Sequence, residues 1–594
     1  MAKILGYLKL KEWLMVGVCL VFIVIQVWLD LKLPDYMSEV TTLTQTPGSA
    51  INDIWRTGGY MLLCALGSLA TAIIVGFFAS HIGASFSQRL RSMLFNKVES
   101  FSMEEINFFS TSSLITRSTN DVTHVHMLVV MGLLLAVKAP IMAVWAVTKI
   151  AGKGVEWSMV TASGVLLVLF MVTLLMIFVM PKFRMMQTLT DNITRVTREN
   201  LTGLRVVRAY NAEEYQEGKF ETANSEFTGT QLYTSRAMAM MMPVIQLMMS
   251  GISLAIFWIG AYLIDAAGMT ITTAGVPGNL AIFANMVVFS QYAIQVIMSF
   301  MMLVMIFIML PRAAVSAKRI NEVLDTVSTI VGGNETEGKP GVTGEVTFNH
   351  VSFKYPGAAE PVLDDICFTA KQGETVAFIG STGSGKSTLI NLVPRFFDVT
   401  EGEVLIDGVN VKDYKLDSLL NKIGYVPQRA VIFKGTVEAN VAYGDNGSGE
   451  EYTIDDVKRA VQIAQGTDFV ENMDGEYMAL IAQDGTNVSG GQKQRISIAR
   501  AVCRNPEIYI FDDSFSALDY KTDRILRSVL KKETAGITSL IVAQRIGTIM
   551  DADQIIVLDD GRIAGKGTHK QLLHDCSVYR EIAMSQLSED ELAS

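Results

Sequence analysis

Hydrophobic and polar residues follow different patterns in the two halves of the chain. The first half contains long, nearly uninterrupted apolar runs, separated by stretches that are rich in charged residues. A helix needs about 20 apolar residues to cross a hydrocarbon core of about 30 Å, and the runs are of this order of length. The pattern predicts six membrane-spanning helices, near residues 14–29, 58–78, 127–150, 157–180, 237–264 and 280–310.

The second half has the pattern of an α/β domain. Strand-like runs occur at residues 345–355, 375–379, 403–406, 508–511, 539–543 and 554–558, with helical patterns between them. A glycine-rich polar segment at residues 331–340 marks the boundary between the halves. We therefore expect an α-helical transmembrane domain at residues 1–325 with two long cytoplasmic loops, a linker at 326–344, and an α/β domain at 345–594.

Basic residues indicate the orientation of the membrane part, because they concentrate on the cytoplasmic side. The loops after the second and fourth predicted spans are rich in them, whereas residues 33–54 and 266–279 contain none. We expect a multi-pass protein of the cytoplasmic membrane, with both termini and the α/β domain in the cytoplasm. The basic residues expected on that side include Arg89, Arg91, Lys97, Arg117, Lys182, Arg184, Arg195, Arg198, Arg205, Arg208, Lys219, Arg312, Lys318 and Arg319.

The composition agrees with a membrane protein and argues against some classes of ligand. Of the 594 residues, 50% are hydrophobic and only 18% are charged, and the mean hydropathy is +0.33. The net charge of −10 argues against a nucleic-acid-binding surface. The five cysteines are scattered without a C-x-x-C pair, and the spacing of the six histidines predicts no metal-ligand cluster.

Residues 380–388 fit the phosphate-binding pattern G-x-x-x-x-G-K-[ST], after a β-rich run and before a helical one. In such a loop the backbone N–H groups surround the β-phosphate, and the helix N-terminus adds partial positive charge. We expect the ammonium of Lys386 to reach the β- and γ-phosphates and the hydroxyl of Ser387 to bind Mg²⁺. The predicted nucleotide contacts here are Ser381, Thr382, Gly383, Ser384, Gly385, Lys386, Ser387 and Thr388.

Three further segments carry chemistry that suits a nucleotide. Tyr355 precedes the loop by about 25 residues and is either a ring that stacks on adenine or an edge-strand aromatic. Asp512 ends a buried apolar strand and is expected to hold Mg²⁺ directly or through water. A serine, a glycine backbone and a helix N-terminus form a second anion site, at Ser489, Gly490, Gly491 and Gln492.

Together these motifs resemble an ABC exporter half-transporter, in which a six-span membrane domain is fused to an ABC-type P-loop NTPase domain. The resemblance covers nearly the whole chain. In the terms of that family, Tyr355 is similar to the A-loop aromatic, and residues 380–388 and 489–492 are similar to the Walker A and signature motifs. Gln428 resembles the Q-loop glutamine, so the expected Mg²⁺ contacts are Ser387, Gln428 and Asp512.

The resemblance also implies partners and a mechanism. It implies ATP and Mg²⁺ as cofactors, a lipid bilayer, and a second half-transporter chain. Two ATP molecules are clamped between two such domains, each between the Walker A motif of one and the signature motif of the other. Residues 516–519 resemble the D-loop, and residues 113–121 and 203–211 resemble the loop segments that transmit this closure to the membrane domain.

Two positions depart from the family pattern. Where the family has a catalytic glutamate, this chain has Asp513, whose carboxylate is retracted by about one C–C bond length, roughly 1.5 Å. Where the family has a histidine, this chain has Gln544, which donates a hydrogen bond but carries no charge. The alternative explanation for both departures is neutral drift, without an effect on hydrolysis. We expect a site that binds ATP but hydrolyses it weakly, in a heterodimer similar to bacterial heterodimeric multidrug exporters; a homodimeric pump is the alternative.

The sequence does not identify the substrate. Methionine is frequent in the last two predicted spans, and unbranched thioethers suit either an adaptable apolar cavity or ordinary helix and lipid packing. A small hydrophobic or amphiphilic substrate is expected; lipid or peptide export, importer ATPase activity and a nucleotide-gated regulatory subunit are the alternatives. Lys138, inside the third span, either contacts substrate or has a structural partner in the bundle. The methionines are Met238, Met240, Met241, Met242, Met248, Met249, Met298, Met301, Met302, Met305 and Met309.

Overall fold

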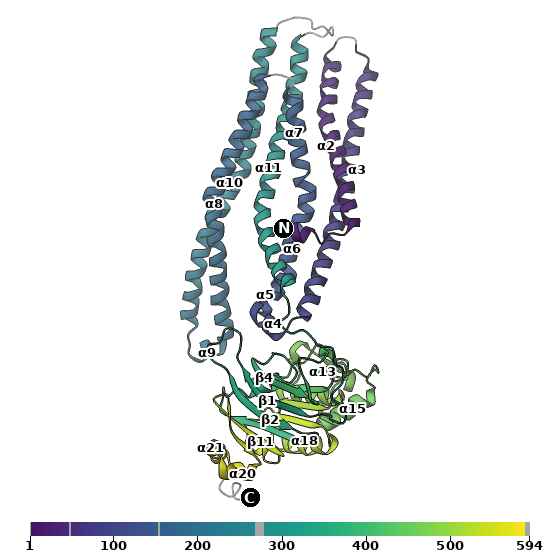
Figure 1. Cartoon of the computed structure of the whole chain (residues 1–594). Helices are drawn as coiled ribbons and strands as arrows, with labels where there is room; N and C mark the ends of the chain where they lie inside the picture. The colour runs from purple at the N-terminus through teal and green to yellow at the C-terminus, as the bar shows by residue number, and fades with distance from the viewer. Residues whose placement is uncertain (1, 47–48, 152–154, 268–277, 588–594) are drawn as a thin grey trace. The chain divides into compact units, whose positions relative to one another are not determined.

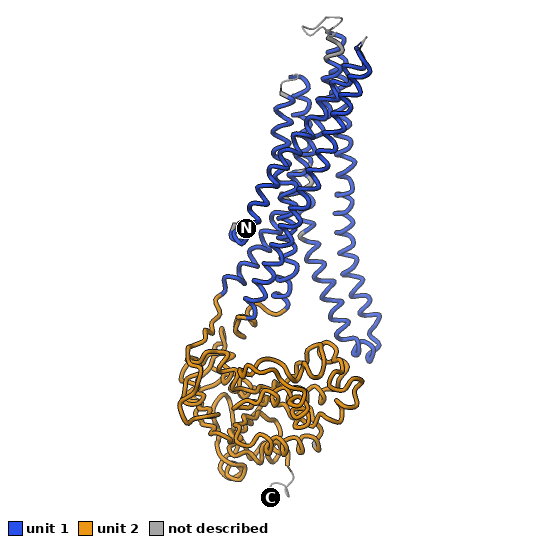
Figure 2. Tube along the Cα trace, turned by 90° about the vertical axis from the view of Figure 1, so that its right-hand side faces the viewer, with its two compact units in different colours: residues 1–99, 112–326 blue, residues 100–111, 327–594 orange. Residues whose placement is uncertain are grey.

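A computed structural model describes residues 2–46, 49–151, 155–267 and 278–587. They form two compact units, shown in different colours in Figure 2. One unit comprises Met1–Glu99 and Ser112–Thr326, and the other comprises Ser100–Thr111 and Val327–Ser594. The short segment from the first half is tied to the second unit by Glu105, whose carboxylate accepts a hydrogen bond of 2.9 Å from the N–H of Thr329.

The first unit, called the membrane unit below, is built of helices (Figure 1). Its long helices are α2 (Leu10–Gln45), α3 (Ile51–Glu99), α8 (Val155–Thr202), α10 (Glu213–Ala267) and α11 (Gly278–Asp325). Its shorter elements are α1 (Ala2–Leu5), α5 (Thr111–Thr116), α6 (Val122–Met131), α7 (Lys138–Ala151), α9 (Leu204–Ala209) and the π-helical segments η1 (Arg117–Asp121) and η2 (Gly132–Ala136).

Five helical stretches within the described residues are long and apolar enough to cross a membrane. They are Leu10–Gln45, Ile51–Glu99, Thr111–Ile150, Glu213–Ala266 and Ile282–Asp325. The predicted span at residues 157–180 lies in α8, and its part within Val155–Met171 is apolar. The sixth span stays a prediction. Most of the segment 266–279, which contains no basic residue and was used to predict the orientation, lies outside the described residues.

Helix α11 contributes most to the core of the membrane unit. It packs against α2, α7 and α10, while α2 also packs along α3 and α8 along α10. On α2, the buried residues Ile23, Val27 and Leu31 recur at intervals of four and form one apolar stripe. That stripe belongs to the same buried cluster as Phe289 and Tyr292 of α11. Because apolar residues surround this part of α2 on all sides, packing against the neighbouring helices decides which face is buried.

Two lysines of α7 form ion pairs with α2 inside this bundle. The ammonium of Lys138 lies 3.0 Å from the Asp30 carboxylate, which also accepts a hydrogen bond from Ser68. The ammonium of Lys149 lies 2.7 Å from the carboxylate of Asp35. Of the two roles considered for Lys138, the structure therefore shows the structural partner.

Replacing Lys138 with methionine is expected to destabilise the membrane unit. The change leaves the half-buried Asp30 carboxylate without its cation, and breaking a buried pair from one side costs about 3 kcal/mol. The double variant Asp30→Asn/Lys138→Met should recover most of this loss, since an asparagine at that position still accepts the hydrogen bond from Ser68. Thermal denaturation of the purified variants measures both effects. An unchanged melting temperature in the single variant, with altered transport, would instead support a substrate-contacting role.

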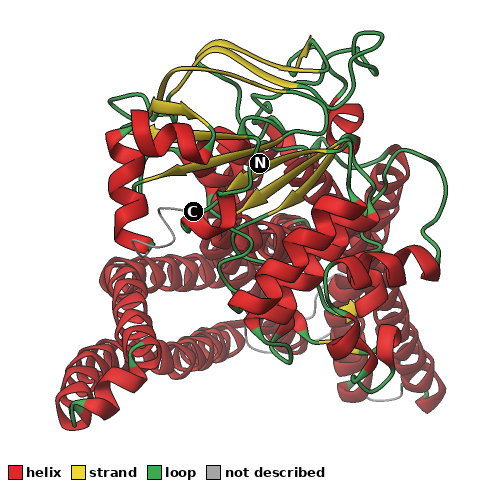
Figure 3. Ribbon diagram, turned by 90° about the horizontal axis from the view of Figure 1, so that it is seen from below, coloured by secondary structure: helices red, strands yellow, loops and turns green. Residues whose placement is uncertain are grey.

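The second unit, called the α/β unit below, contains three sheets, whose strands are drawn in yellow in Figure 3. An antiparallel sheet has the order β2 (Leu363–Ala370), β1 (Val346–Phe353), β4 (Glu401–Ile406) and β5 (Val409–Asn410). A six-stranded sheet has the order β12 (Arg562–Gly567), β11 (Gln554–Asp559), β3 (Thr375–Gly380), β10 (Thr538–Val542), β9 (Ile508–Asp512) and β6 (Ile423–Val426). The short pair is β7 (Gly435–Thr436) and β8 (Leu480–Ile481).

This unit also contains helices, several of which pack against its strands. They are α4 (Met103–Phe109), α12 (Lys386–Asn391), α13 (Leu416–Asn421), α14 (Val437–Val441), α15 (Ile454–Ile463), α16 (Thr467–Glu471), α17 (Gly490–Cys503), α18 (Tyr520–Glu533), α19 (Ile546–Ile549), α20 (His569–Asp575) and α21 (Ser577–Gln586), with single turns η3 (Glu476–Met478) and η4 (Gln483–Gly485). Alternate residues of the central strands face two different cores: in β3, Val376 and Phe378 join one cluster, and Ala377 and Ile379 join the other.

The register of the six-stranded sheet positions the functional loops. Strands β11, β3, β10, β9 and β6 are parallel neighbours in that order, so their carboxyl ends meet at one edge. Four segments that are far apart in the sequence leave the sheet at that edge. They are residues 380–388 after β3, Gln544 after β10, Asp512 and Asp513 at the end of β9, and Gln428 after β6.

Candidate nucleotide-binding site

The loop between β3 and α12 is shaped by glycines. Gly385 has a φ of +94° and directly precedes α12, a conformation that glycine adopts without steric cost. A Cβ at this position would lie 2.7 Å from the Leu363 side chain and 3.1 Å from the carbonyl oxygen of Val362. Only a residue without a side chain therefore allows the loop to turn here and α12 to begin at Lys386.

Lys386 lies against its own loop. Its ammonium donates hydrogen bonds to the carbonyl oxygens of Gly380 (2.9 Å) and Ser381 (2.7 Å) and to the hydroxyl of Ser384 (3.3 Å). Burial lowers the pKa of Lys386, whereas the nearby carboxylates of Asp513 and Asp512 act in the opposite direction. A cation that is partly desolvated and held at the loop is suited to bind phosphate oxygens.

Ser387 and Asp512 form the part of the site that suits Mg²⁺. The hydroxyl of Ser387 donates a 2.9 Å hydrogen bond to the carboxylate of Asp512, which is only 5% exposed. Burial raises the pKa of Asp512, and the hydrogen bond from Ser387 opposes that shift. Mg²⁺ prefers oxygen ligands and usually takes one or two carboxylates together with phosphate oxygens, so this pair fits the ion. When bound, Mg²⁺ neutralises charge that develops on the phosphates.

Asp513 lies where three strand ends meet. Its carboxylate accepts a hydrogen bond from the Gln544 side-chain amide at 2.7 Å and one from Gln428 at 3.5 Å. Its backbone has a φ of +46°, and its N–H donates to the carbonyl oxygen of Val542. Burial raises the pKa of Asp513, against hydrogen bonds from Ser516 and Gln428. The structure thus brings Asp513 and Gln544, the two departures from the family pattern, together with Gln428, the expected Q-loop glutamine.

Tyr355 lies next to the loop helix. Its hydroxyl is 3.1 Å from the hydroxyl of Thr388, and its ring makes edge contacts with Phe353 and Phe397. The ring is half-buried, with part of its surface accessible. Its position beside the phosphate-binding loop is the one that an adenine-stacking residue needs, although Phe353 and Phe397 also give it an ordinary packing role.

Sequence reasoning missed two contributors to this site. Phe397 supports the Tyr355 ring, and the only available signal was its aromatic character shortly after the loop helix. Arg545 lies close enough to Asp513 for its positive charge to oppose the rise in that residue's pKa. Its signal was adjacency to Gln544, at the end of the same strand.

The segment 489–492 has a different location. Ser489 caps α17: its hydroxyl accepts from the N–H of Gln492, whose side chain accepts from the N–H of Ser489 at 2.8 Å. A Cβ on Gly490 would meet no atom within 4 Å, and one on Gly491 would meet the Ala517 carbonyl oxygen at 3.4 Å. Among the described residues, no hydrogen bond joins this segment to residues 380–388. Its open helix N-terminus has the backbone N–H groups and the partial positive charge that suit an anion.

Comparisons with known proteins agree with these features. Residues 15–283 match the ABC transporter transmembrane region, and residues 363–516 match the ABC transporter family proper. An uncharacterized ABC transporter ATP-binding protein of Mycobacterium tuberculosis is 40% identical, covering 89% of this chain and 87% of its own length. The uncharacterized ABC transporter ATP-binding protein YfiB of Bacillus subtilis is 33% identical, covering 99% of both chains. An ATP-dependent lipid A-core flippase of Pseudomonas aeruginosa is 30% identical over 86% of this chain and 82% of its own.

A solved structure shows the same fold. The structure of a bacterial Atm1-family ABC exporter with ATP bound superposes with a TM-score of 0.79 at 22% identity, covering 97% of this chain and 99% of the other. The predicted fold class, a helical membrane domain with an ABC-type nucleotide-binding domain, is thereby confirmed. The ABC ATPase domain implies ATP binding and hydrolysis. The chain belongs to the ABC transporter family, as an exporter-type half-transporter in which a transmembrane domain and an ABC ATPase domain are fused.

Proposed function

We propose that the protein exports small hydrophobic or amphiphilic compounds across the cytoplasmic membrane at the expense of ATP. It acts as one half of a heterodimer, and its own Walker site hydrolyses ATP weakly. The transmembrane domain is residues 1–325 with six spans, the linker is 326–344 and the nucleotide-binding domain is 345–594. Both termini and that domain lie in the cytoplasm, because the basic residues gather on their side of the spans.

The pairing of Asp513 with Gln544 is the observation that carries the proposal. The side chain at the expected base position is an aspartate, and its Oδ2 accepts from the Gln544 amide at 2.7 Å. A general base must reach the proton of the attacking water within about 2.6–3.2 Å. A carboxylate that is shorter by one methylene and already bound to an amide is poorly placed for this, whereas the groups for phosphate and Mg²⁺ are all present.

The helix that begins with the segment 489–492 supports a role in a second site. Ser489 caps this helix, and the space in front of Gly490 is open. Among the described residues, no hydrogen bond joins the segment to the chain's own phosphate-binding loop. We therefore assign this surface to the γ-phosphate of an ATP molecule held by the partner's Walker motif. The partner chain would supply the glutamate and histidine that this chain lacks, which favours a heterodimer over a homodimer.

The membrane unit supports an apolar, adaptable substrate. All eleven methionines of α10 and α11 named above are exposed or half-buried in the single chain, and thioether side chains adapt to varied apolar surfaces. A lipid is the second candidate, because two relatives at 30% and 31% identity are named as ATP-dependent lipid A-core flippases. The two candidates share an amphiphilic substrate and differ in whether it is a free molecule or a bilayer component.

Transport in vesicles tests the proposed function. Tagged chain is purified from its native membrane with its bound partner and reconstituted, and uptake of a fluorescent amphiphilic dye is compared with translocation of a fluorescent phospholipid. We expect ATP-dependent dye uptake that is lost with a non-hydrolysable analogue. The matched control is Lys386→Ala together with the equivalent change in the partner. Phospholipid translocation alone would favour the lipid exporter, and flux without hydrolysis would contradict both.

A further inference from the structure

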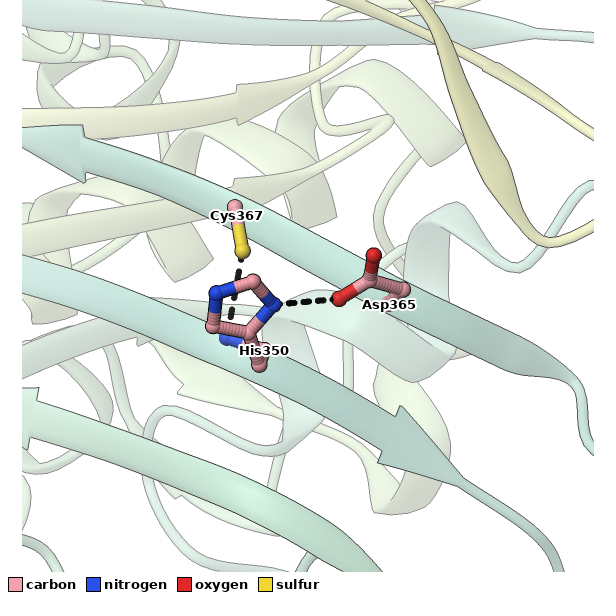
Figure 4. A group of neighbouring side chains, drawn as sticks. All are labelled: His350, Asp365 and Cys367. Carbon is pink, nitrogen blue, oxygen red and sulfur yellow. Dashed lines mark hydrogen bonds and ion pairs between the residues drawn. The ribbon is translucent and has the colours of Figure 1, made fainter.

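The outer face of the antiparallel sheet in the α/β unit carries a cluster of three potential metal ligands. His350 of β1 and Asp365 and Cys367 of β2 present one nitrogen, one oxygen and one sulfur atom, all within 4.8 Å of one another. Figure 4 shows the three side chains converging from the two strands. The sequence alone predicted no histidine cluster, because His350 and Asp365 are 15 positions apart in the chain.

Two β-bulges bring these side chains together. Between the pairs Phe348–Phe368 and Val351–Ile366, β1 has two residues where β2 has only Cys367. Between the pairs Val351–Ile366 and Phe353–Leu363, β2 has two residues where β1 has one. His350 lies in the first bulge and Asp365 in the second. Bulges redirect side chains and occur often beside functional sites.

The backbone at both bulges takes an uncommon conformation. His350 has a φ of +49° and Asp365 a φ of +53°, a region that side chains other than glycine rarely occupy. As a result, the Nδ1 of His350 lies 2.6 Å from the Asp365 carboxylate, and the N–H of His350 donates to the Cys367 sulfur at 3.2 Å. An N–H donor stabilises a thiolate, which is the form of cysteine that binds metal.

We propose that His350, Asp365 and Cys367 form a binding site for a zinc-class divalent metal ion. A thiolate, an imidazole and a carboxylate together select Zn²⁺ or a similar borderline ion over Mg²⁺ or Ca²⁺, which take oxygen ligands. Tetrahedral coordination at 2.0–2.3 Å places ligand atoms about 3.3–3.8 Å apart, so exposed side chains need to move by about 1 Å. His350 and Asp365 are 73% and 68% exposed and free to make that movement, and water supplies the fourth ligand.

The site is independent of the transported substrate and of Mg²⁺ at the ATP site. It lies on the same strand that leads to Phe353 and then to Tyr355, beside the phosphate-binding loop. A metal ion bound there cross-links β1 to β2 at the bulges. Its binding therefore fixes the strand that leads to Tyr355, the aromatic ring of the nucleotide site.

Co²⁺ serves as the spectroscopic probe, because a thiolate ligand gives it an intense charge-transfer absorption. The full chain is stripped with chelator, reconstituted in lipid nanodiscs and titrated with Co²⁺ in excess Mg²⁺ and without nucleotide. We expect one Co²⁺ per chain with thiolate absorption, displaced by Zn²⁺. Cys367→Ser should abolish the absorption, and His350→Ala should lower the affinity at least 10-fold, comparable to losing a supporting contact of a metal site.

The chain provides a matched control. His574 and Asp575 form an equally short exposed pair, with Nδ1 and Oδ1 2.6 Å apart, that belongs to no three-ligand group among the described residues. His574→Ala should therefore leave the titration unchanged. Retained ATP binding shows that the Cys367→Ser and His350→Ala chains are folded. Absence of thiolate absorption in the wild type, or absorption that survives Cys367→Ser, would overturn the proposal.

Discussion

The double variant Asp513→Glu/Gln544→His is expected to raise the ATPase rate of the purified chain by about 100-fold over the wild type. Glutamate extends the carboxylate by one methylene, and a shift of about 1 Å in a positioned catalytic group changes the rate by about that factor. Histidine removes the amide that binds Asp513 at 2.7 Å in the present structure and supplies a group that carries positive charge. The rate is measured in lipid with the chain alone.

The controls separate binding from chemistry. The wild type should bind ATP with an affinity similar to that of the double variant, because Lys386, Ser387 and Asp512 are unchanged. Adding Lys386→Ala to the double variant should return the rate to background. A brisk rate in the wild type, with little gain in the double variant, would show that Asp513 is an adequate base. The case for a heterodimer would then lose its main support.

The second large effect is expected at the start of α17. In the purified complex with its partner, Gly490→Asp should lower the ATPase rate by about 100-fold. It places a negative charge at a helix N-terminus that we propose binds a phosphate, and removing a single hydrogen-bond donor from such a site costs about 100-fold or more. A Cβ at position 490 meets no atom within 4 Å, so the fold should tolerate the change.

Two matched variants serve as controls for the effect of Gly490→Asp. Gly490→Ala adds the Cβ without charge and should keep most of the activity. Asp513→Asn, which removes the charge of the carboxylate at the chain's own base position, should change the rate of the complex by less than about twofold if the competent site uses the partner's glutamate. Equal, severe losses in Gly490→Asp and Asp513→Asn would mean that both sites turn over. Such a result contradicts the proposed division of labour even if transport is observed.

Local sequence signals predicted most of the α/β unit. Each strand-like run, such as residues 375–379 and 508–511, corresponds to an observed strand, here β3 and β9. The prediction missed β2, β6 and β12, and also the two-residue strands β5, β7 and β8. Strand β2 matters for the proposed metal site, since it carries Asp365 and Cys367. Bulges interrupt its pattern, so a period of two could not reveal it.

The sequence predicted which residues belong to the nucleotide site, but it did not predict which of them contact one another. The pattern at residues 380–388 indicates a phosphate loop because the glycines and the lysine act within one turn of chain. By contrast, the bond between Asp513 and Gln544 joins residues 31 positions apart. It depends on β9 and β10 being parallel neighbours. Nothing in either segment specifies that neighbour relation.

The sequence by itself determined the two-part organisation, the apolar helices, the phosphate loop and the two departures at Asp513 and Gln544. These follow from periodicity and residue type within a few positions, which act through the local backbone. Only the tertiary structure decided that Lys138 pairs with Asp30 and that His350 lies beside Asp365 and Cys367. Such contacts join residues that are distant in the chain, and helix packing and strand register, set by burial over whole units, bring them together.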